Sequence, residues 1–385
     1  MKPAKITSLS LAFLCAGNML LCSCDSTPVP SDTTAVPTTV TSETTATTTE
    51  ETTEQAWVTY ANAKDSSPYK EIELDGVKEN YVVTTDYCYL ESEKYIVFMD
   101  KDLKIPGDFA VNLDAIIEEL EKQLGLEACP ESYGGGRVVD KSSYYEPDES
   151  GKKINPWEDW DIGNKIAIFL VVDREDKALL SVAEETHVVI CTYSLFSDDL
   201  WNSVPTYKNN AWRRDKYVDY SMIAHELTHT ITLRSCCLTN ILTEGIAEYM
   251  GWSVLKSLSK QYPSIGEAYK KTNFDDSPLP KVVSAKNAES IFIDDYHALS
   301  HKDRGAEYYY GKRLWQYIYA TNGSDCFIKY VNAINEKNLR YNYIEYNKNF
   351  TTQYADTLKE LFGKDVFTGF GNWCVKNKYL QSRST

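Results

Sequence analysis

Residues 223–231, Ile-Ala-His-Glu-Leu-Thr-His-Thr-Ile, contain the pattern H-E-x-x-H in a chain of 385 residues with only five histidines. Residues four apart lie on one helix face, with Cβ atoms about 5–6 Å apart, so two imidazoles can bind one zinc ion. At about 100° per residue, the three aliphatic residues of the stretch fall on the opposite face. The stretch therefore predicts a helix that buries one side and presents His225 and His229 to a metal. Glu226 lies beside them, where it can act on water at the metal.

A catalytic zinc site needs a third protein ligand and an open position. The extended form of the motif, with a third histidine, is absent because Thr232 and Ser235 occupy the positions of its Gly and last His. Downstream, the letters L-T-E-G-I-A-E-Y place Glu244 and Glu248 four residues apart, with Gly245 between them. We expect a second helix that brings a carboxylate to the histidines, and a glycine that lets the helices approach closely.

The HELTH sequence followed by E-G-x-A-x-Y resembles the gluzincin metallopeptidases, which include thermolysin and the aminopeptidase-N-like enzymes. The resemblance implies one Zn²⁺ ion held by His225, His229 and Glu244, with Glu226 as general base and Glu248 orienting the first histidine. Fourteen residues separate His229 from Glu244. Aminopeptidase-N-like enzymes have eighteen residues before their ligand, a spacing that would select Glu248. We assign Glu244 from its local context and keep Glu248 as the alternative.

A second feature of the aminopeptidase-N-like enzymes is Y-x-x-G at the start of a helix, and residues 308–311 read Y-Y-Y-G. The resemblance implies that Tyr308 donates a hydrogen bond to the oxyanion. Core packing is the alternative in a chain with 28 tyrosines. His297 and His301 are alternative donors of the thermolysin type. The G-x-M-E-N segment that holds a substrate's α-amine is absent, so no motif supports exopeptidase activity.

The N-terminus predicts an exported lipoprotein. Residues 1–23 contain two lysines followed by an apolar stretch, which is typical of a signal peptide. Residues 21–24, Leu-Cys-Ser-Cys, resemble a bacterial lipobox, so we expect lipid on Cys24 and attachment to the extracellular face of the cell membrane through that lipid alone. Residues 24–56 are rich in Thr, Ser and Glu and contain no Lys, Arg or aromatic residue, which predicts a disordered stalk.

Composition limits the partners. The chain has 40 Lys and Arg against 56 Asp and Glu, a net charge of −16, so nucleic acid is excluded as a main partner. We expect a monomer whose partner is a peptide or protein substrate. Seven cysteines follow Cys24, an odd number that leaves at least one thiol free, and no pair has the C-x-x-C spacing of a thiolate zinc site.

Hydrophobic patterning predicts an α+β fold. Runs of β-branched and aromatic residues predict strands at residues 81–83, 95–98, 166–172 and 187–192. Apolar residues at helical spacing predict a helix that Asn112 opens and Gly125 closes. Beyond about residue 216 the pattern is helical. We therefore predict a mixed α/β lobe with a β-sheet over residues 57–215 and a mainly helical, gluzincin-type lobe over residues 216–385. No internal repeat is apparent.

The leading hypothesis is a zinc metallopeptidase that cleaves peptide bonds at the cell exterior. One alternative is a catalytically inactive protein that keeps the peptidase fold; the intact Glu226 argues against it. The other is a glycan-binding surface lipoprotein whose zinc is structural. Such a zinc would need a fourth protein ligand, which Cys236 or Cys237 could supply.

Overall fold

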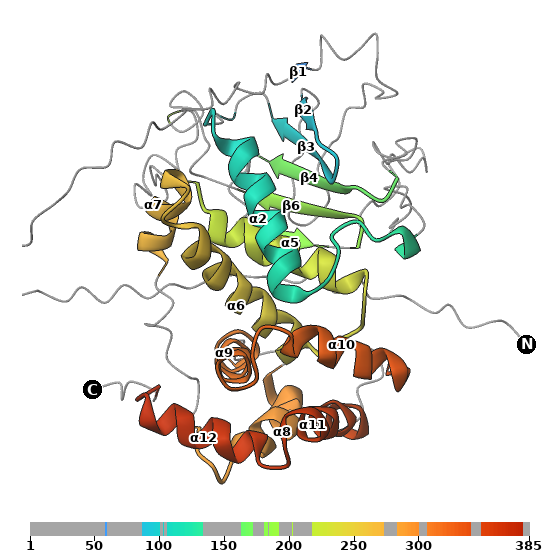
Figure 1. The fold of residues 1–385 in the computed structure, drawn as a ribbon, viewed down its shortest axis with the longest axis vertical. Helices are drawn as coiled ribbons and strands as arrows, with labels where there is room; N and C mark the ends of the chain where they lie inside the picture. Colours follow the sequence, from blue (N-terminus) through green and yellow to red (C-terminus); the bar gives the residue numbers. More distant parts are fainter. Residues whose placement is uncertain are drawn as a thin grey trace, which may run out of the picture.

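A computed structural model of the chain describes residues 58–59, 87–100, 103, 106–133, 163–171, 181–183, 185–191, 202, 218–272, 283–299, 306–339 and 348–379. These residues form a mixed α and β structure, with a sheet at one end and stacked helices at the other (Figure 1). The expected signal peptide, the stalk with Cys24 and the expected strand at 81–83 lie outside the described residues.

The sheet is mixed, with a parallel centre. In sheet order, the strands are β1 (Val58–Thr59), β2 (Tyr87–Glu91), β3 (Tyr95–Asp100), β4 (Ile166–Val171), β6 (His187–Cys191) and β5 (Val182–Ala183). β3, β4 and β6 are parallel, with Val97 paired to Ile168 and Ile168 to Val188, whereas the outer strands pair antiparallel. Three of the four expected strands are confirmed. β4 is an unbroken apolar run because both faces of a central parallel strand are covered.

Helix α2 (Phe109–Leu124) lies in the crossover between the parallel strands β3 and β4 and runs across one face of the sheet (Figure 1). Its N-cap residue is Asp108, four residues before the expected Asn112. Asn112 does not cap it; this side chain is buried and donates from Nδ2 to the hydroxyl of Tyr220 at 3.0 Å. The expected end is confirmed, because Gly125 has φ +70° and a Cβ there would lie 2.9 Å from Ile328 Cβ.

The helical pattern beyond residue 216 is confirmed in the described residues. The helices are α5 (Tyr220–Leu233), α6 (Asn240–Leu258), α7 (Pro263–Lys271), α8 (Ala288–Leu299), the π-helix η4 (Ala306–Tyr310), α9 (Gly311–Asn322), α10 (Cys326–Glu336), α11 (Lys348–Phe362) and α12 (Val366–Lys376). A short 3₁₀ helix, η1 (Glu131–Tyr133), follows α2. None of the described helices is long and apolar enough to span a bilayer. α6 packs against α2, α5, α7, η4 and α9, so it is the central helix of the molecule (Figure 1).

The last four helices repeat a structural unit that the sequence analysis did not detect. α9 and α10 form one pair, and α11 and α12 form another, forty residues later. Gly323 and Gly363 stand at equivalent turns with φ +87° and +100°, while Asn338 and Lys378 follow the second helices with φ +51° and +58°. The shared letters G-x-D-x-F mark both turns. The two helix pairs share few identical residues, because the turn requires particular residues whereas the helix faces require only apolar ones.

Contacts between distant segments join the sheet to the helices. Most of the buried apolar residues of strands and helices form one cluster that includes Tyr95 and Ile168 as well as Leu242 and Trp315. At the C-terminal end of α5, the Arg234 guanidinium donates to backbone carbonyls that precede β4 and β6 and follow α2, namely those of Asn164 at 2.7 Å, Lys165 at 3.0 Å, Glu185 at 2.6 Å and Ala128 at 2.6 Å. These bonds fix α5 against the sheet.

Candidate metal centre

Helix α5 carries both histidines of the H-E-x-x-H motif. Its first turn is capped by Asp219, whose Oδ1 accepts a hydrogen bond from the backbone N–H of Met222 at 3.2 Å. Ile223, Leu227 and Ile231 are fully buried in the core, which confirms the apolar face that the periodicity predicts. The histidines therefore lie on the other side of α5, toward α6.

Glycines of α6 set its distance from two neighbouring helices. A Cβ at Gly251 would lie 2.8 Å from the carbonyl oxygen of Ser221, so this glycine allows α6 to approach α5. Gly245 does permit a close approach, as expected, but toward α9: a Cβ there would overlap with the backbone of Gly311. Sequence reasoning missed Gly251, because nothing in its neighbourhood shows which helix it faces.

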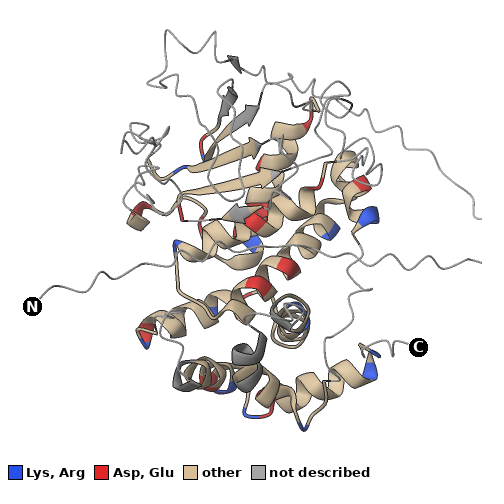
Figure 2. Ribbon diagram, turned by 180° about the vertical axis from the view of Figure 1, so that it is seen from behind, with Lys and Arg blue, Asp and Glu red and all other residues tan. Residues whose placement is uncertain are grey.

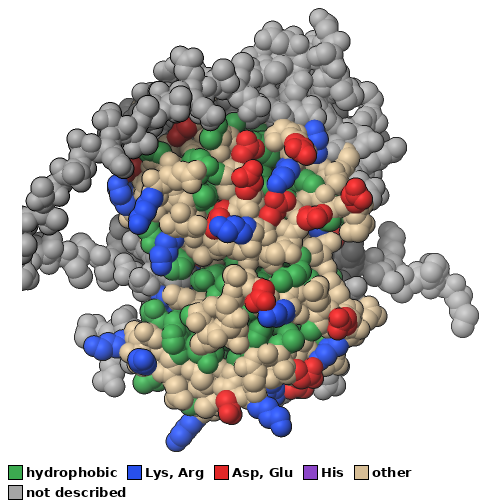
Figure 3. All heavy atoms as spheres, in the orientation of Figure 1, with side chains coloured by type: hydrophobic (Ala, Val, Ile, Leu, Met, Phe, Trp, Pro, Cys, Tyr) green, Lys and Arg blue, Asp and Glu red, His purple; other side chains and the backbone are tan. Residues whose placement is uncertain are grey.

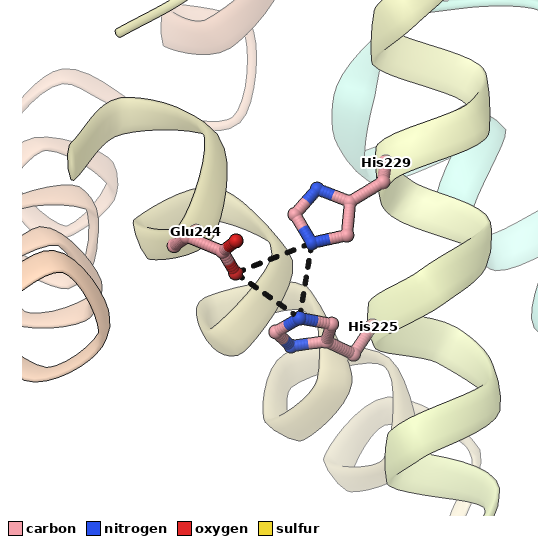
Figure 4. A group of neighbouring side chains, drawn as sticks. All are labelled: His225, His229 and Glu244. Atoms are coloured by element: carbon pink, nitrogen blue, oxygen red, sulfur yellow. Dashed lines mark hydrogen bonds and ion pairs between the residues drawn. The ribbon is translucent and has the colours of Figure 1, made fainter. Parts of the chain in front are cut away.

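Three side chains converge on one point between α5 and α6. Nε2 of His225 and Nε2 of His229 are 3.0 Å apart, and Oε2 of Glu244 lies 3.4 Å from the first and 3.3 Å from the second (Figure 4). That carboxylate oxygen is buried and has no hydrogen-bond partner among the described residues. An ionised oxygen buried without a donor is costly unless a cation is nearby. The group could hold a metal ion.

Glu248, one turn further along α6, lies on the other side of the first imidazole. Its Oε1 is 3.4 Å from Nδ1 of His225, and its Oε2 is 3.4 Å from Nζ of Lys312 on α9. It does not belong to the convergent group. The structure thus places Glu244 in the position of a third ligand and Glu248 in the position of a residue that orients His225.

The site is electrostatically suited to a cation. Burial lowers the pKa of His225, but the adjacent carboxylates of Glu244 and Glu248 outweigh it and hold the pKa well above its usual value. Burial raises the pKa of Glu244, yet the two imidazoles hold it far below the usual range. Burial also raises the pKa of Glu226, and the histidines offset this only in part. Figure 2 shows acidic residues of α6 in the middle of the molecule. A cation bound there would compensate their negative charge.

Tyr308 is brought to the metal group by the packing of the helix that follows it. The tyrosine lies in η4, which continues directly into α9, and its ring stacks on that of His225 with centroids 6.2 Å apart and planes at 17°. By contrast, Tyr310 is fully buried and donates to the carbonyl of Ala288 at 2.6 Å. Of these two tyrosines, Tyr308 faces the site and Tyr310 packs in the core.

Access to the group is narrow. His225 and His229 each retain 8% exposure, and Glu226 retains 5%. On the face drawn in Figure 3, basic and acidic side chains are scattered among apolar and other residues, and none of the described histidines is visible. The group is therefore not open on this face.

Neither neighbouring cysteine joins the metal group. Among the cysteines whose side chains the structure describes, Cys129, Cys237, Cys326 and Cys374 are free thiols, and neither these nor Cys236 belongs to the convergent set. Burial raises the pKa of Cys326 and of Cys374 to about 12, which keeps both thiols protonated and unreactive at neutral pH. The side chains of His297 and His301, the alternative oxyanion donors, lie outside the described residues.

No model of a known protein family matches the chain, and no curated protein is similar to it in sequence.

Proposed function

We propose that the protein is a zinc-dependent peptidase with a gluzincin-type centre that hydrolyses peptide bonds outside the cell. The observation that carries the proposal is the convergence of His225, His229 and Glu244 on one point, with Glu226 buried on the same helix as the two histidines.

The donor set and its dimensions favour zinc. Bonds of about 2.0–2.1 Å at tetrahedral angles place two zinc ligands about 3.3–3.4 Å apart, and the three distances within the group are 3.0, 3.3 and 3.4 Å. Two imidazoles and one carboxylate are the ligands of many catalytic zinc sites. The group contains no fourth ligand among the described residues. Three protein ligands with a free fourth position favour catalysis over the structural zinc of the glycan-binding alternative.

Each residue around the metal group has a role in peptide hydrolysis. A bound zinc ion would supply Lewis acidity at the scissile carbonyl and lower the pKa of water. Glu226 accepts the proton of the attacking water on its carboxylate and delivers it to the leaving amine, so that no proton is gained or lost overall. The hydroxyl of Tyr308 donates to the oxyanion, a contribution of about 3–4 kcal/mol for one donor. Glu248 keeps His225 oriented.

An extended peptide is the substrate that the neighbourhood of α5 fits. β5 is the last strand in the order of the described strands, pairs only with β6 among them, and contacts α5. The outer edge of such a strand presents backbone N–H and C=O groups that an extended peptide can pair with.

Metal analysis and peptide digestion of Glu226→Gln test this function. We expect wild-type protein to bind one zinc ion and to cleave members of a peptide library. Glu226→Gln should keep the zinc and the melting temperature but lose about 10²–10⁴-fold in kcat/KM, because only the proton acceptor is removed. Glu267→Gln, an exposed acid on α7, is the matched control and should match wild type. Equal rates in Glu226→Gln and wild type would contradict the mechanism, and zinc binding without cleavage would favour the inactive alternative.

We place this activity on the outer face of the cell membrane, held by lipid on Cys24. Incorporation of a labelled fatty acid that disappears in Cys24→Ala would support the anchor. Unchanged labelling of that variant would contradict it.

A further inference from the structure

A lysine is buried beside the metal centre, outside both motifs that define it. Lys312, on α9, is 3% exposed, and it is the only lysine among the described residues that is classed as buried. Removing an ammonium group from water is costly, so lysines are rarely buried without a partner. A group that compensates its charge is therefore expected nearby.

The ammonium group of Lys312 faces the carboxylate that contacts His225. Nζ lies 3.4 Å from Oε2 of Glu248 and 5.5 Å from the ring centroid of Tyr309. The other oxygen of Glu248 lies 3.4 Å from Nδ1 of His225. Lysine, carboxylate and imidazole thus form a chain of contacts that runs from α9 through α6 to α5.

We propose that Lys312 is a positioning residue of the metal centre, which fixes the Glu248 carboxylate so that it holds the His225 ring in its metal-binding orientation. The inference rests on the proposed function, in which His225 binds zinc. A histidine that donates its Nδ1–H to a fixed carboxylate keeps the lone pair of Nε2 directed at the metal. Without Lys312, the carboxylate of Glu248, whose side chain is 30% exposed, can rotate toward solvent.

Lys312 is also connected to the site through Tyr308, which lies on the same helical segment. It lies four residues after Tyr308 in the continuous helical segment formed by η4 and α9. The contact between Lys312 and Glu248 therefore also ties the segment that carries Tyr308 to the helix that carries Glu244. Lys312 thus connects Glu248, which orients His225, to the helical segment that carries Tyr308, the oxyanion donor.

A double-mutant cycle on zinc affinity tests the proposal. Full-length wild type, Lys312→Met, Glu248→Gln and the double variant are titrated with zinc against a chelator of known affinity. We expect Lys312→Met to weaken zinc binding by about 3- to 30-fold and Glu248→Gln by about 10- to 100-fold. If Lys312 acts through Glu248, Lys312→Met should weaken binding less than about 2-fold further in the Glu248→Gln background. In steady-state assays, Lys312→Met should lower kcat more than it raises KM.

Two further variants separate positioning from general stability. Lys359→Met is the matched control, because Lys359 joins α11 to Glu289 of α8 at 2.8 Å without contacting the metal group; its zinc affinity should equal that of wild type. Lys312→Gln, which keeps a hydrogen-bond donor without the charge, replaces Lys312→Met if the latter does not fold.

The outcomes distinguish this inference from the proposed function. Unchanged zinc affinity, a full additional loss in the double variant, or tighter zinc binding in Lys312→Met would each overturn the role of Lys312. Tighter binding would show that the ammonium group only repels the cation. Failure of wild type to bind zinc would instead contradict the proposed function.

Discussion

Two glutamates one turn apart on α6 have different chemical surroundings. Oε2 of Glu244 is buried, lacks a hydrogen-bond partner and faces both Nε2 atoms of the histidine pair. Glu248 is shared between Nδ1 of His225 and the ammonium of Lys312. Burial raises the pKa of Glu248, but the hydrogen bond to His225 and the charge of Lys312 hold it below the usual range. Glu248 is held between an Nδ1 atom and an ammonium group, whereas Glu244 faces the two Nε2 atoms that would bind the same metal ion, so Glu244 is the better placed of the two to bind it.

Substitution of the two acids should therefore have unequal effects on metal content. Glu244→Gln removes an anionic ligand and should leave the site largely empty at micromolar zinc. Glu248→Gln should retain zinc but lose about 10- to 100-fold in affinity or turnover, because it removes only an orienting contact. Zinc content after dialysis, measured by mass spectrometry, separates the two. The reverse order would identify Glu248 as the ligand, and equal small effects would mean that neither acid faces the metal.

At the scale of elements, the site depends on where α6 crosses its neighbours. Gly251 of α6 meets the backbone of α5, and Gly245 meets Gly311 at the start of α9. These crossings set the distance from the histidines to Glu244 and from His225 to Tyr308. Backbone atoms on the opposing helix cannot rotate away as a side chain can, so a methyl group at either crossing must displace a whole helix.

Gly245→Ala should destabilise the protein although alanine favours helix more than glycine does. The propensity gain is about 1 kcal/mol, whereas the overlap with the backbone of Gly311 should cost more, leaving a net loss of about 1–3 kcal/mol in the free energy of unfolding. Urea denaturation measures the loss. Lys256→Ala, at an exposed position of the same helix, should change stability by less than about 0.5 kcal/mol. Wild-type stability in Gly245→Ala would show that α6 and α9 are further apart than the structure has them.

At the scale of the whole molecule, contacts with the sheet hold α5, the helix that carries both histidines of the candidate metal site. Arg234 donates four hydrogen bonds to carbonyls around the ends of β4, β6 and α2, and its guanidinium lies 4.4 Å from the ring centroid of Tyr133. A planar group with five donors can satisfy several carbonyls in one plane, which the single ammonium of lysine cannot. The position of α5 therefore depends on segments 49 to 106 residues away in the chain.

Replacement of Arg234 should weaken the attachment of α5 to the sheet, and the loss of stability should depend on how many hydrogen bonds the new residue keeps. Arg234→Met leaves four carbonyls without their donor and should cost about 2–4 kcal/mol in the free energy of unfolding. Arg234→Lys keeps the charge but satisfies fewer carbonyls, so its loss should be smaller than that of Arg234→Met and larger than zero. Thermal and urea unfolding of the three proteins give the order. A lysine variant as stable as wild type would mean that charge alone, and not the fork of donors, holds α5 to the sheet.

The features that the sequence determined by itself are local and periodic. The i, i+4 spacing of His225 and His229 and the apolar residues opposite them specify an amphipathic helix whatever surrounds it. The strands at β3, β4 and β6 and the end of α2 at Gly125 were likewise predictable, because they depend on β-branched runs and on a single backbone conformation.

Only the tertiary structure decided which groups meet across helices. Spacing left Glu244 and Glu248 as alternative ligands, since a connecting loop can place either turn of α6 beside α5; the packing brings Glu244 to the histidines and turns Glu248 to Lys312. Asn112 appeared to open α2 because nothing local showed that Tyr220 would bind its side chain. Such contacts join residues tens to more than a hundred positions apart. They depend on how the helices pack in three dimensions, which no local pattern in the chain encodes.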